Sequence, residues 1–293
     1  IPLRLVGSEM CIRDRLWADQ NNLNLINVSS NAQLSYLHLY NCGLTNMDLS
    51  QNINLRNLIV DNNSIANLDL SNNSELLELR AYGNSLTEID LTNNLQLENL
   101  SISNNPIETL DVSYLASLKH LNIESMGLTQ IDVTNNTLLE FFRVGNNELT
   151  SLDISSNANL ILLYVYNNSL TELDLSQNLM LSAFSAGNTG ISNYDLSNNL
   201  QLTEIYLQNN GVISIDLTLY PELAYLDLHG NELISLDLSN NPLLHYVNLH
   251  NNQLTTLDLS DRPNLQFLHC HSNSLEMLNL KHGSCLLYTS PSP

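Results

Sequence analysis

Positive charge is scarce in this chain, and its scarcity excludes several classes of partner. The 293 residues contain nine Lys and Arg against thirty Asp and Glu, a formal net charge of −21. Such a chain repels the phosphates of nucleic acids and anionic membrane surfaces, so we expect neither as a partner. No apolar run reaches the roughly 20 residues of a membrane-spanning helix, and we expect no membrane insertion of this sequence.

Catalytic motifs are missing too. The sequence contains no P-loop, GxSxG, HExxH, paired CxxC or strand-linked GxGxxG motif. Its polar residues recur at regular intervals rather than converging on one cleft, as catalysis would require. We therefore expect no enzyme and no cofactor.

Leucines recur every 21 residues from Leu34 to Leu265 and open twelve units without an insertion. Each unit contains LxxLxLxxN twice, and in LxL the leucines share one face of a strand. This pattern predicts a β-rich solenoid of about 12–13 coils of 21 residues. A parallel sheet would cover one side, with short extended strands on the opposite side. Cys42 and Cys270 lie eleven coils apart, too far for a disulfide.

An asparagine column is the second regular feature. Where the chain turns inward after each strand, buried backbone groups need partners, and an amide side chain supplies both donors and an acceptor. We expect Asn147→Ala to cost about 1–3 kcal/mol. Cys42, Met126 and Thr189 interrupt the column. Its predicted members are Asn63, Asn84, Asn105, Asn147, Asn168, Asn210, Asn231, Asn252 and Asn273.

The sequences LTSLDISSN at 149–157 and LTTLDLS at 254–260 point to a family. The unit resembles the leucine-rich repeat, and its length and LTxLDLSxN pattern resemble the internalin-J-like bacterial class over about residues 16–283. That class carries Cys at the first Asn position, which only Cys42 does here. The resemblance implies a concave sheet as ligand face and an extracellular or cell-surface location.

The two chain ends break the repeat. Residues 1–15 and 284–293 resemble translated sequencing-adapter read-through, and we interpret them as non-native. The alternative is that they are genuine cap or linker peptide. On the first interpretation, residues 16–283 are a solenoid fragment without caps.

Aromatic residues and histidines gather at the third, fifth and seventh positions of the units, which alternation places on the solvent side of the predicted sheet. Exposed tyrosines suit a binding surface, although aromatics also favour strands for packing alone. Arg80 and Arg143 could orient an anionic or sugar partner, or be solvated. The candidate face comprises Tyr36, His38, Tyr40, Arg80, Tyr82, Phe141, Arg143, Tyr164, Tyr166, Tyr206, Tyr225, His229, Tyr246, His250, His269 and His271.

Three of these histidines, His229, His250 and His271, share the seventh position of consecutive units and should stack in a column. Neighbouring imidazoles can bind a transition metal. The alternative, which we favour, is a patch that gains charge below about pH 6.5. We therefore predict no metal site.

An aspartate column lies in the second half of the units, each member followed two residues later by Ser or Thr. We expect hydrogen bonds from those residues to offset the repulsion between carboxylates. Bound Ca²⁺ is the alternative, disfavoured because the GGxGxDxUx motif is absent. The column comprises Asp48, Asp69, Asp90, Asp111, Asp132, Asp153, Asp174, Asp195, Asp216, Asp237 and Asp258.

Together these features predict a non-catalytic protein-binding or adhesion module of a secreted or surface bacterial protein, with its partner on the concave sheet. One alternative is a polysaccharide-binding module that uses the exposed tyrosines. Another is the targeting module of a larger secreted enzyme.

Overall fold

The computed structural model describes residues 14–281, and within them it contains short strands and no helix. Every strand is three residues long. The strands are β1 (Arg15–Trp17), β2 (Tyr36–His38), β3 (Asn57–Ile59), β4 (Glu78–Arg80), β5 (Asn99–Ser101), β6 (His120–Asn122), β7 (Phe141–Arg143), β8 (Leu162–Tyr164), β9 (Ala183–Ser185), β10 (Glu204–Tyr206), β11 (Tyr225–Asp227), β12 (Tyr246–Asn248), β13 (Thr256–Asp258), β14 (Phe267–His269) and β15 (Met277–Asn279).

The strands pair in parallel at an offset of one repeat. Leu37 pairs with Leu58, and Leu226 pairs with Val247, each 21 residues further along the chain. The chain divides into two compact units, residues 1–148 and 149–293. In the first unit β1 to β7 pair in sequence order, and in the second β8 to β12 and then β14 do so. The predicted solenoid of 21-residue coils with a parallel sheet is confirmed.

The core lies directly behind these strands. Leu37 and Leu39, at the fourth and sixth positions of their coil, are 0% exposed, and the equivalent residues of the other coils are buried with few exceptions. The third, fifth and seventh positions project from the other side of the strands, on a surface that we call the sheet face. Alternation along each strand thus separates the core from the sheet face.

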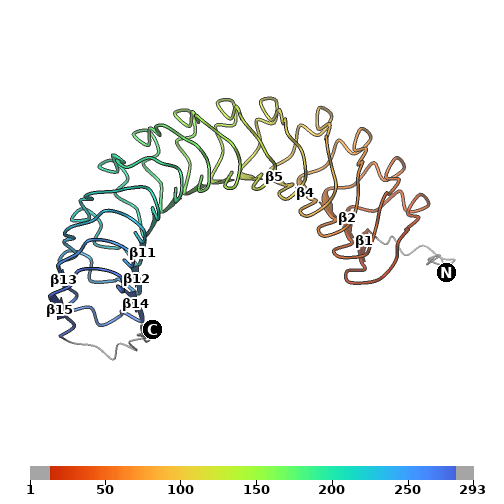
Figure 1. Cartoon of the computed structure of the whole chain (residues 1–293). Coiled ribbons are helices and arrows are strands. Elements are labelled where there is room, and N and C mark those ends of the chain that lie inside the picture. Colours follow the sequence, from red (N-terminus) through yellow and green to blue (C-terminus); the bar gives the residue numbers. More distant parts are fainter. Residues whose placement is uncertain (1–13, 282–293) are drawn as a thin grey trace. The chain divides into compact units, whose positions relative to one another are not determined.

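The opposite side of the coils has less regular structure than the parallel sheet. Among the described residues only β13 and β15 pair there, on the far side of the coils from β12 and β14 (Figure 1). The backbone turns at the end of this stretch in all these coils, that of β13 included: the N–H of Ser50 bonds to its own coil's Asp48, and the N–H of Ser260 bonds to Asp258. A backbone N–H that bonds within its own coil cannot also donate to a β-ladder with the next coil.

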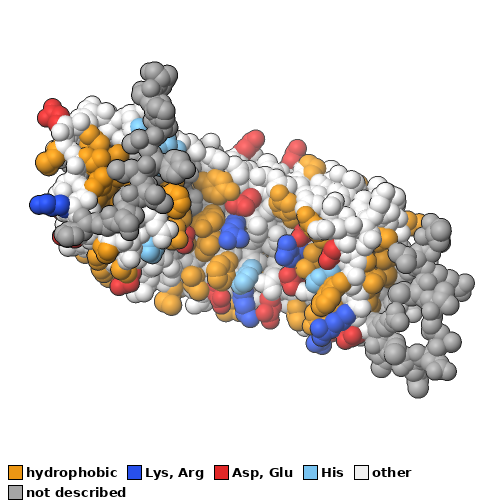
Figure 2. Space-filling model, turned by 90° about the horizontal axis from the view of Figure 1, so that it is seen from below, with side chains coloured by type: hydrophobic (Ala, Val, Ile, Leu, Met, Phe, Trp, Pro, Cys, Tyr) orange, Lys and Arg blue, Asp and Glu red, His pale blue; other side chains and the backbone are white. Residues whose placement is uncertain are grey.

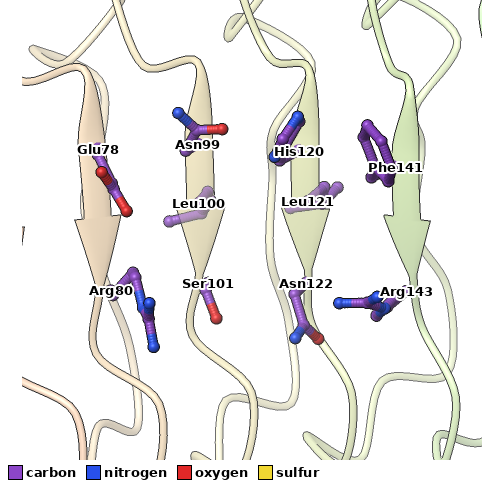
Figure 3. Close-up of a pocket in the computed structure, with 10 residues that line it drawn as sticks. All are labelled: Glu78, Arg80, Asn99, Leu100, Ser101, His120, Leu121, Asn122, Phe141 and Arg143. Atoms are coloured by element: carbon purple, nitrogen blue, oxygen red, sulfur yellow. The ribbon is translucent and has the colours of Figure 1, made fainter.

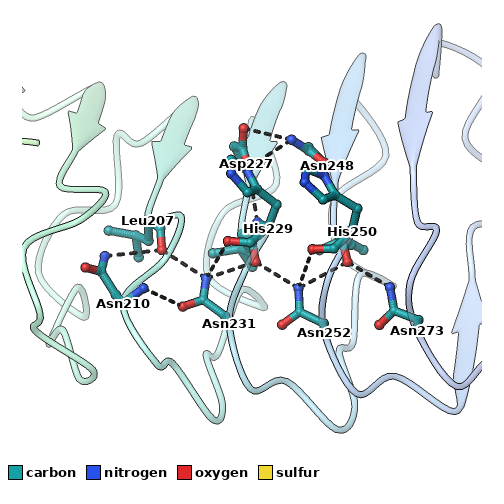
Figure 4. Close-up of polar contacts among 11 residues, drawn as sticks. Leu207, Asn210, Asp227, His229, Asn231, Asn248, His250, Asn252 and Asn273 are labelled. Atoms are coloured by element: carbon teal, nitrogen blue, oxygen red, sulfur yellow. Dashed lines mark hydrogen bonds and ion pairs between the residues drawn. The ribbon is translucent and has the colours of Figure 1, made fainter. Parts of the chain in front are cut away.

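The predicted asparagine column holds the coils together. The Nδ2 of Asn147 donates to the carbonyls of Ile123 and Val144 at 2.9 Å, and its Oδ1 accepts from the backbone N–H groups of Met126 and Leu128. Figure 4 shows the same arrangement from Asn210 to Asn273. All nine predicted members bond the carbonyl three residues before them in their own coil.

Thr189 interrupts this column, and the Tyr194 hydroxyl supplies additional hydrogen bonds at that position. The Thr189 hydroxyl reaches the Ala186 carbonyl at 3.0 Å, but it has fewer hydrogens to donate than an amide. The Tyr194 hydroxyl lies 2.6 Å from Thr189 Oγ1 and donates to the same Ala186 carbonyl at 3.2 Å. Burial raises the pKa of Tyr194 to about 12, so the phenol stays protonated.

Removing that hydroxyl should therefore destabilise the coil. We expect Tyr194→Phe to cost about 1–2 kcal/mol, because the ring stays while the hydroxyl's contacts with Thr189 Oγ1 and the Ala186 carbonyl are both lost. Urea unfolding followed by circular dichroism measures this cost. Tyr82→Phe is the comparison, since Tyr82 is 38% exposed, and an equal or larger loss there would contradict this role of Tyr194.

A second polar column crosses the other turn of each coil. Asn94 donates to the carbonyls of Leu70 and Asn73, while its buried Oδ1 has no hydrogen-bond partner. Two later coils replace the asparagine but keep its bond to the carbonyl 24 residues earlier. Tyr220 donates to Leu196 at 2.7 Å, and Arg262 donates to Leu238. Long polar side chains thus substitute for the amide without breaking the repeat.

The chain ends lie mostly outside the described residues. The interpretation of 1–15 and 284–293 as non-native falls on 1–13 and 282–293, of which the structure describes nothing. Arg15, which that interpretation includes, lies in β1 and pairs with Tyr36. The interpretation of both ends as non-native stays a prediction.

Candidate functional site

Alternation places the predicted binding residues on the sheet face. In the first unit these are Tyr36, His38, Tyr40, Arg80, Tyr82, Phe141 and Arg143, and in the second Tyr164, Tyr166, Tyr206, Tyr225, His229, Tyr246, His250, His269 and His271. None of them is fully buried, and Tyr82 and Tyr225 are 38% and 40% exposed. Figure 2 views this side and shows hydrophobic side chains interspersed with charged side chains and histidines.

The sheet face of the first unit contains a hollow of about 350 Å³ over β4 to β7 (Figure 3). One row of its lining residues holds Glu78, Asn99, His120 and Phe141, and the next holds Arg80, Ser101, Asn122 and Arg143. The rings of His120 and Phe141 lie 4.5 Å apart at a tilt of 60°. The hollow has the size of a small-ligand site and carries both charge signs.

Arg80 is partly exposed but is paired with a buried carboxylate. Its guanidinium donates to Asp61 Oδ2 at 2.7 Å, and the Asp61 side chain is 3% exposed. Asp61 Oδ1 also accepts from the backbone N–H of Tyr82 at 2.9 Å. Arg80 therefore neutralises a buried carboxylate of the preceding coil. Sequence reasoning missed Asp61, although an aspartate 19 residues before an arginine at these repeat positions is a usable signal.

In the second unit three of the predicted tyrosines lie on or directly after the two strands that flank β9. The rings of Tyr164 and Tyr166 lie 6.5 Å apart, while Tyr206 stands on β10, beyond β9. The Tyr206 hydroxyl donates to Glu204 Oε2 at 3.1 Å. Burial first, and then the Glu204 carboxylate, raise the pKa of Tyr206. Tyr206 therefore stays protonated and keeps Glu204 on this face.

The three predicted histidines form a stacked column, of which Figure 4 shows His229 and His250. The rings of His229 and His250 lie 4.4 Å apart at 9°, and those of His250 and His271 lie 4.7 Å apart at 16°. His229 Nδ1 lies 2.6 Å from Asp227 Oδ1, and His250 Nδ1 lies 2.6 Å from Asn248 Oδ1. Asn248 in turn donates to Asp227 Oδ2 at 3.0 Å, so Asp227 and Asn248 orient the column from the fifth position.

The stacked geometry does not suit a shared metal ion. Imidazole lone pairs lie in the ring plane, so parallel rings aim them side by side rather than at one point about 2 Å away. Within residues 14–281 no group of three or more His, Cys, Asp or Glu is arranged to hold a metal. The same residues include no helix that could cross a membrane.

The aspartates of the column accept hydrogen bonds from the Ser or Thr two residues later, as expected from the sequence. Asp90 Oδ1 accepts from the hydroxyl of Thr92 at 2.7 Å and from its backbone N–H at 2.9 Å. These two bonds, the hydroxyl first, hold the pKa of Asp90 below its usual value of 3.8. The equivalent bond from the backbone N–H recurs from Asp48 to Asp258.

These pKa shifts predict acid sensitivity in two stages. Burial, and then His229 and His271, lower the pKa of His250 from 6.5, with His269 adding to and Asp227 opposing that effect. A group whose folded pKa is lowered contributes stability above its unfolded pKa and loses it as pH falls through the folded value. We expect the melting temperature to fall slightly below pH 6.5, and further once the aspartates protonate below pH 3.8.

Melting curves between pH 8 and pH 3 check this expectation. The variant His250→Gln should remove the first stage and leave the second. A first stage of unchanged size in that variant would contradict the assignment to the histidine column.

Comparison with protein-family models and with curated protein sequences finds no match. Solved structures do match. The functional domain of InlJ from Listeria monocytogenes, described as including a cysteine ladder, is 31% identical with a TM-score of 0.78. That match covers 88% of this chain and 62% of the InlJ chain.

Two further bacterial structures share the fold. LIC12759 from Leptospira interrogans is 24% identical with a TM-score of 0.74, over 87% of this chain and 77% of that one. The internalin InlF from Listeria monocytogenes is 18% identical with a TM-score of 0.67, over 92% and 88%. With its 21-residue coils, parallel sheet and asparagine column, this chain is therefore a leucine-rich repeat protein, similar in sequence and structure to InlJ.

Proposed function

We propose that this solenoid is a non-catalytic protein-recognition module of a secreted or cell-surface bacterial protein, that it acts in adhesion, and that its partner binds the sheet face. The similarity to InlJ supports the class of protein. Structures that share only the fold include a plant peptide hormone receptor in complex with RGF2 and a Toll–Spatzle complex.

The observation that carries the proposal is the composition of the sheet face. Polar side chains would satisfy a solvent-facing strand equally well, yet this face presents tyrosines, histidines and phenylalanines along both units. Phe267 is 53% exposed and lies against Tyr246, with ring centroids 6.2 Å apart. Exposed aromatic residues with polar tips are enriched where proteins bind one another.

The charge distribution favours the same face. Eleven of the thirty acidic residues belong to the aspartate column in the second half of the units. A row of exposed carboxylates is strongly hydrated, and burying it against a partner would require the loss of that water. The sheet face carries fewer charges among its rings, so it is the side on which a partner can exclude water.

Parallel protein and glycan arrays test the proposal. We expect the intact chain to bind members of an extracellular protein array, and a variant with Tyr164, Tyr166 and Tyr206 changed to Ala to lose binding about tenfold or more. A control with Asp195, Asp216 and Asp237 changed to Asn alters the other face of the same unit and should keep binding. Melting curves establish that both variants fold.

The alternative outcome identifies the polysaccharide-binding function. Binding to the glycan array that disappears in the tyrosine variant, with no binding to proteins, would replace the protein partner by a sugar. Loss of protein binding in the aspartate control alone would place recognition on the other face and overturn the proposal.

A further inference from the structure

Strand β9 differs from every other strand at its solvent-facing positions. Ala183, Ser185 and the following Gly187 are all small, whereas neighbouring coils carry tyrosine, glutamate or glutamine at most of these positions. The register pairs Ser185 with Tyr164 on one side and with Tyr206 on the other. Ser185 is 7% exposed, so its short side chain projects little from the sheet face.

An unsatisfied acceptor lies beside this strand. The amide of Gln208 rests on Gly187, where an added Cβ would come within 2.2 Å of Gln208 Cδ. Gln208 Oε1 is buried and has no hydrogen-bond partner. A buried carbonyl oxygen without a donor is unfavourable, and a bound N–H group would relieve it.

Negative charge on this part of the sheet face is not balanced by Lys or Arg, although His229 lies against Asp227. Glu204 and Asp227 stand on the adjacent strands β10 and β11. In the described part of the second unit, no Lys or Arg occupies a solvent-facing position of β8 to β12 or β14, whereas β4 and β7 of the first unit each carry an arginine.

We propose that the β9 cluster, defined as Tyr164, Tyr166, Glu204, Tyr206 and Gln208, binds an arginine or lysine side chain of a basic segment of the partner protein. This inference rests on the proposed function and names the chemistry of one anchor. Two strand spacings separate the Tyr164 and Tyr206 backbones by about 10 Å, enough for a flat cation between two rings. A cation within about 6 Å of a tyrosine ring is attracted to its face.

The polar members of the cluster complete the site. The Glu204 carboxylate neutralises the cation, and Tyr206, which bonds Glu204 at 3.1 Å, holds that carboxylate in place. The Gln208 amide, which faces only a hydrogen at Gly187, turns on binding so that its buried Oε1 accepts an N–H bond from the bound side chain. An acidic or uncharged segment would leave Glu204 unbalanced and Gln208 unsatisfied, so the cluster selects a basic partner.

Peptide titration tests the proposal on the full chain. The probes are fluorescein-labelled hexa-arginine and hexa-glutamate, measured by fluorescence anisotropy at low and at physiological salt. We expect hexa-arginine to bind and hexa-glutamate not to bind. Tyr206→Leu and Glu204→Gln should each weaken binding about tenfold, while Tyr206→Phe, which keeps the ring, should weaken it less than Tyr206→Leu.

Asp216→Asn is the matched control, because it removes the same charge from the opposite face. Equal weakening by Asp216→Asn and Glu204→Gln would show attraction by net charge alone and would overturn the proposal. So would unchanged binding in Tyr206→Leu, or no binding of hexa-arginine. If Tyr206→Leu melts early, Glu204→Gln decides. The peptide titration and the protein array are independent measurements. Failure of the cation site in the titration would therefore leave the proposed protein-binding function to be decided by the array.

Discussion

Replacing Asn147 by alanine is expected to lower the free energy of unfolding by about 3 kcal/mol, the upper end of the range predicted from sequence. The structure explains the size of the effect. The substitution deprives two buried backbone N–H groups, those of Met126 and Leu128, of their acceptor, and the carbonyls of Ile123 and Val144 lose a donor. Urea unfolding monitored by circular dichroism measures the loss.

Asn94→Ala is the internal comparison. Asn94 belongs to the second column, donates two bonds to carbonyls and has a buried Oδ1 that accepts none. Its loss leaves no backbone N–H unpaired, so we expect a cost of about 1 kcal/mol. A larger cost for Asn94→Ala than for Asn147→Ala would show that the first column is not the stronger link between coils.

Replacing Phe184 by alanine is expected to cost about 3–5 kcal/mol, the largest effect of any single change considered. Phe184 is 0% exposed, and its ring makes an edge contact with Tyr194 at a centroid distance of 5.6 Å. It lies directly beneath the small residues of β9, so a cavity there cannot be filled from the sheet face. Thermal and urea unfolding both measure the effect.

Phe184→Leu restores the residue that most coils have at this position and should cost less than about 1.5 kcal/mol. If leucine proves as damaging as alanine, the loss comes from the contact with Tyr194 rather than from volume. If alanine costs less than 1 kcal/mol, the core behind β9 is not packed as the structure shows it.

The fold could be predicted almost entirely from sequence because the same core and turn residues recur in nearly every unit. Leucine spacing sets the core, and the asparagine position sets the turn, as the bonds of Asn63 and Asn147 confirm. The substitutes were not predicted. Tyr220 and Arg262 reach the same carbonyls as an asparagine only because their side chains are long, which a pattern of residue types does not encode.

The details of the sheet face were less accessible. The histidine column followed from alternation, but the pairing of Arg80 with Asp61 and the bond of Tyr206 to Glu204 depend on rotamers. The prediction of the binding face included only its large residues and omitted Ala183, Ser185 and Gly187. The small size of those residues is what allows Tyr164 and Tyr206 to share the proposed site.

Recognition by the sheet face is tested most directly by photo-crosslinking from its two sides. A benzoylphenylalanine at Tyr225 projects from the sheet face, and one at Ser235 projects from the side of Asp237; both positions are exposed in the second unit. The probe is a preparation of solubilised cell-surface proteins. We expect protease-sensitive adducts from position 225 and few or none from position 235. Adducts from position 235 alone, or equal yields from both, would contradict binding through the sheet face.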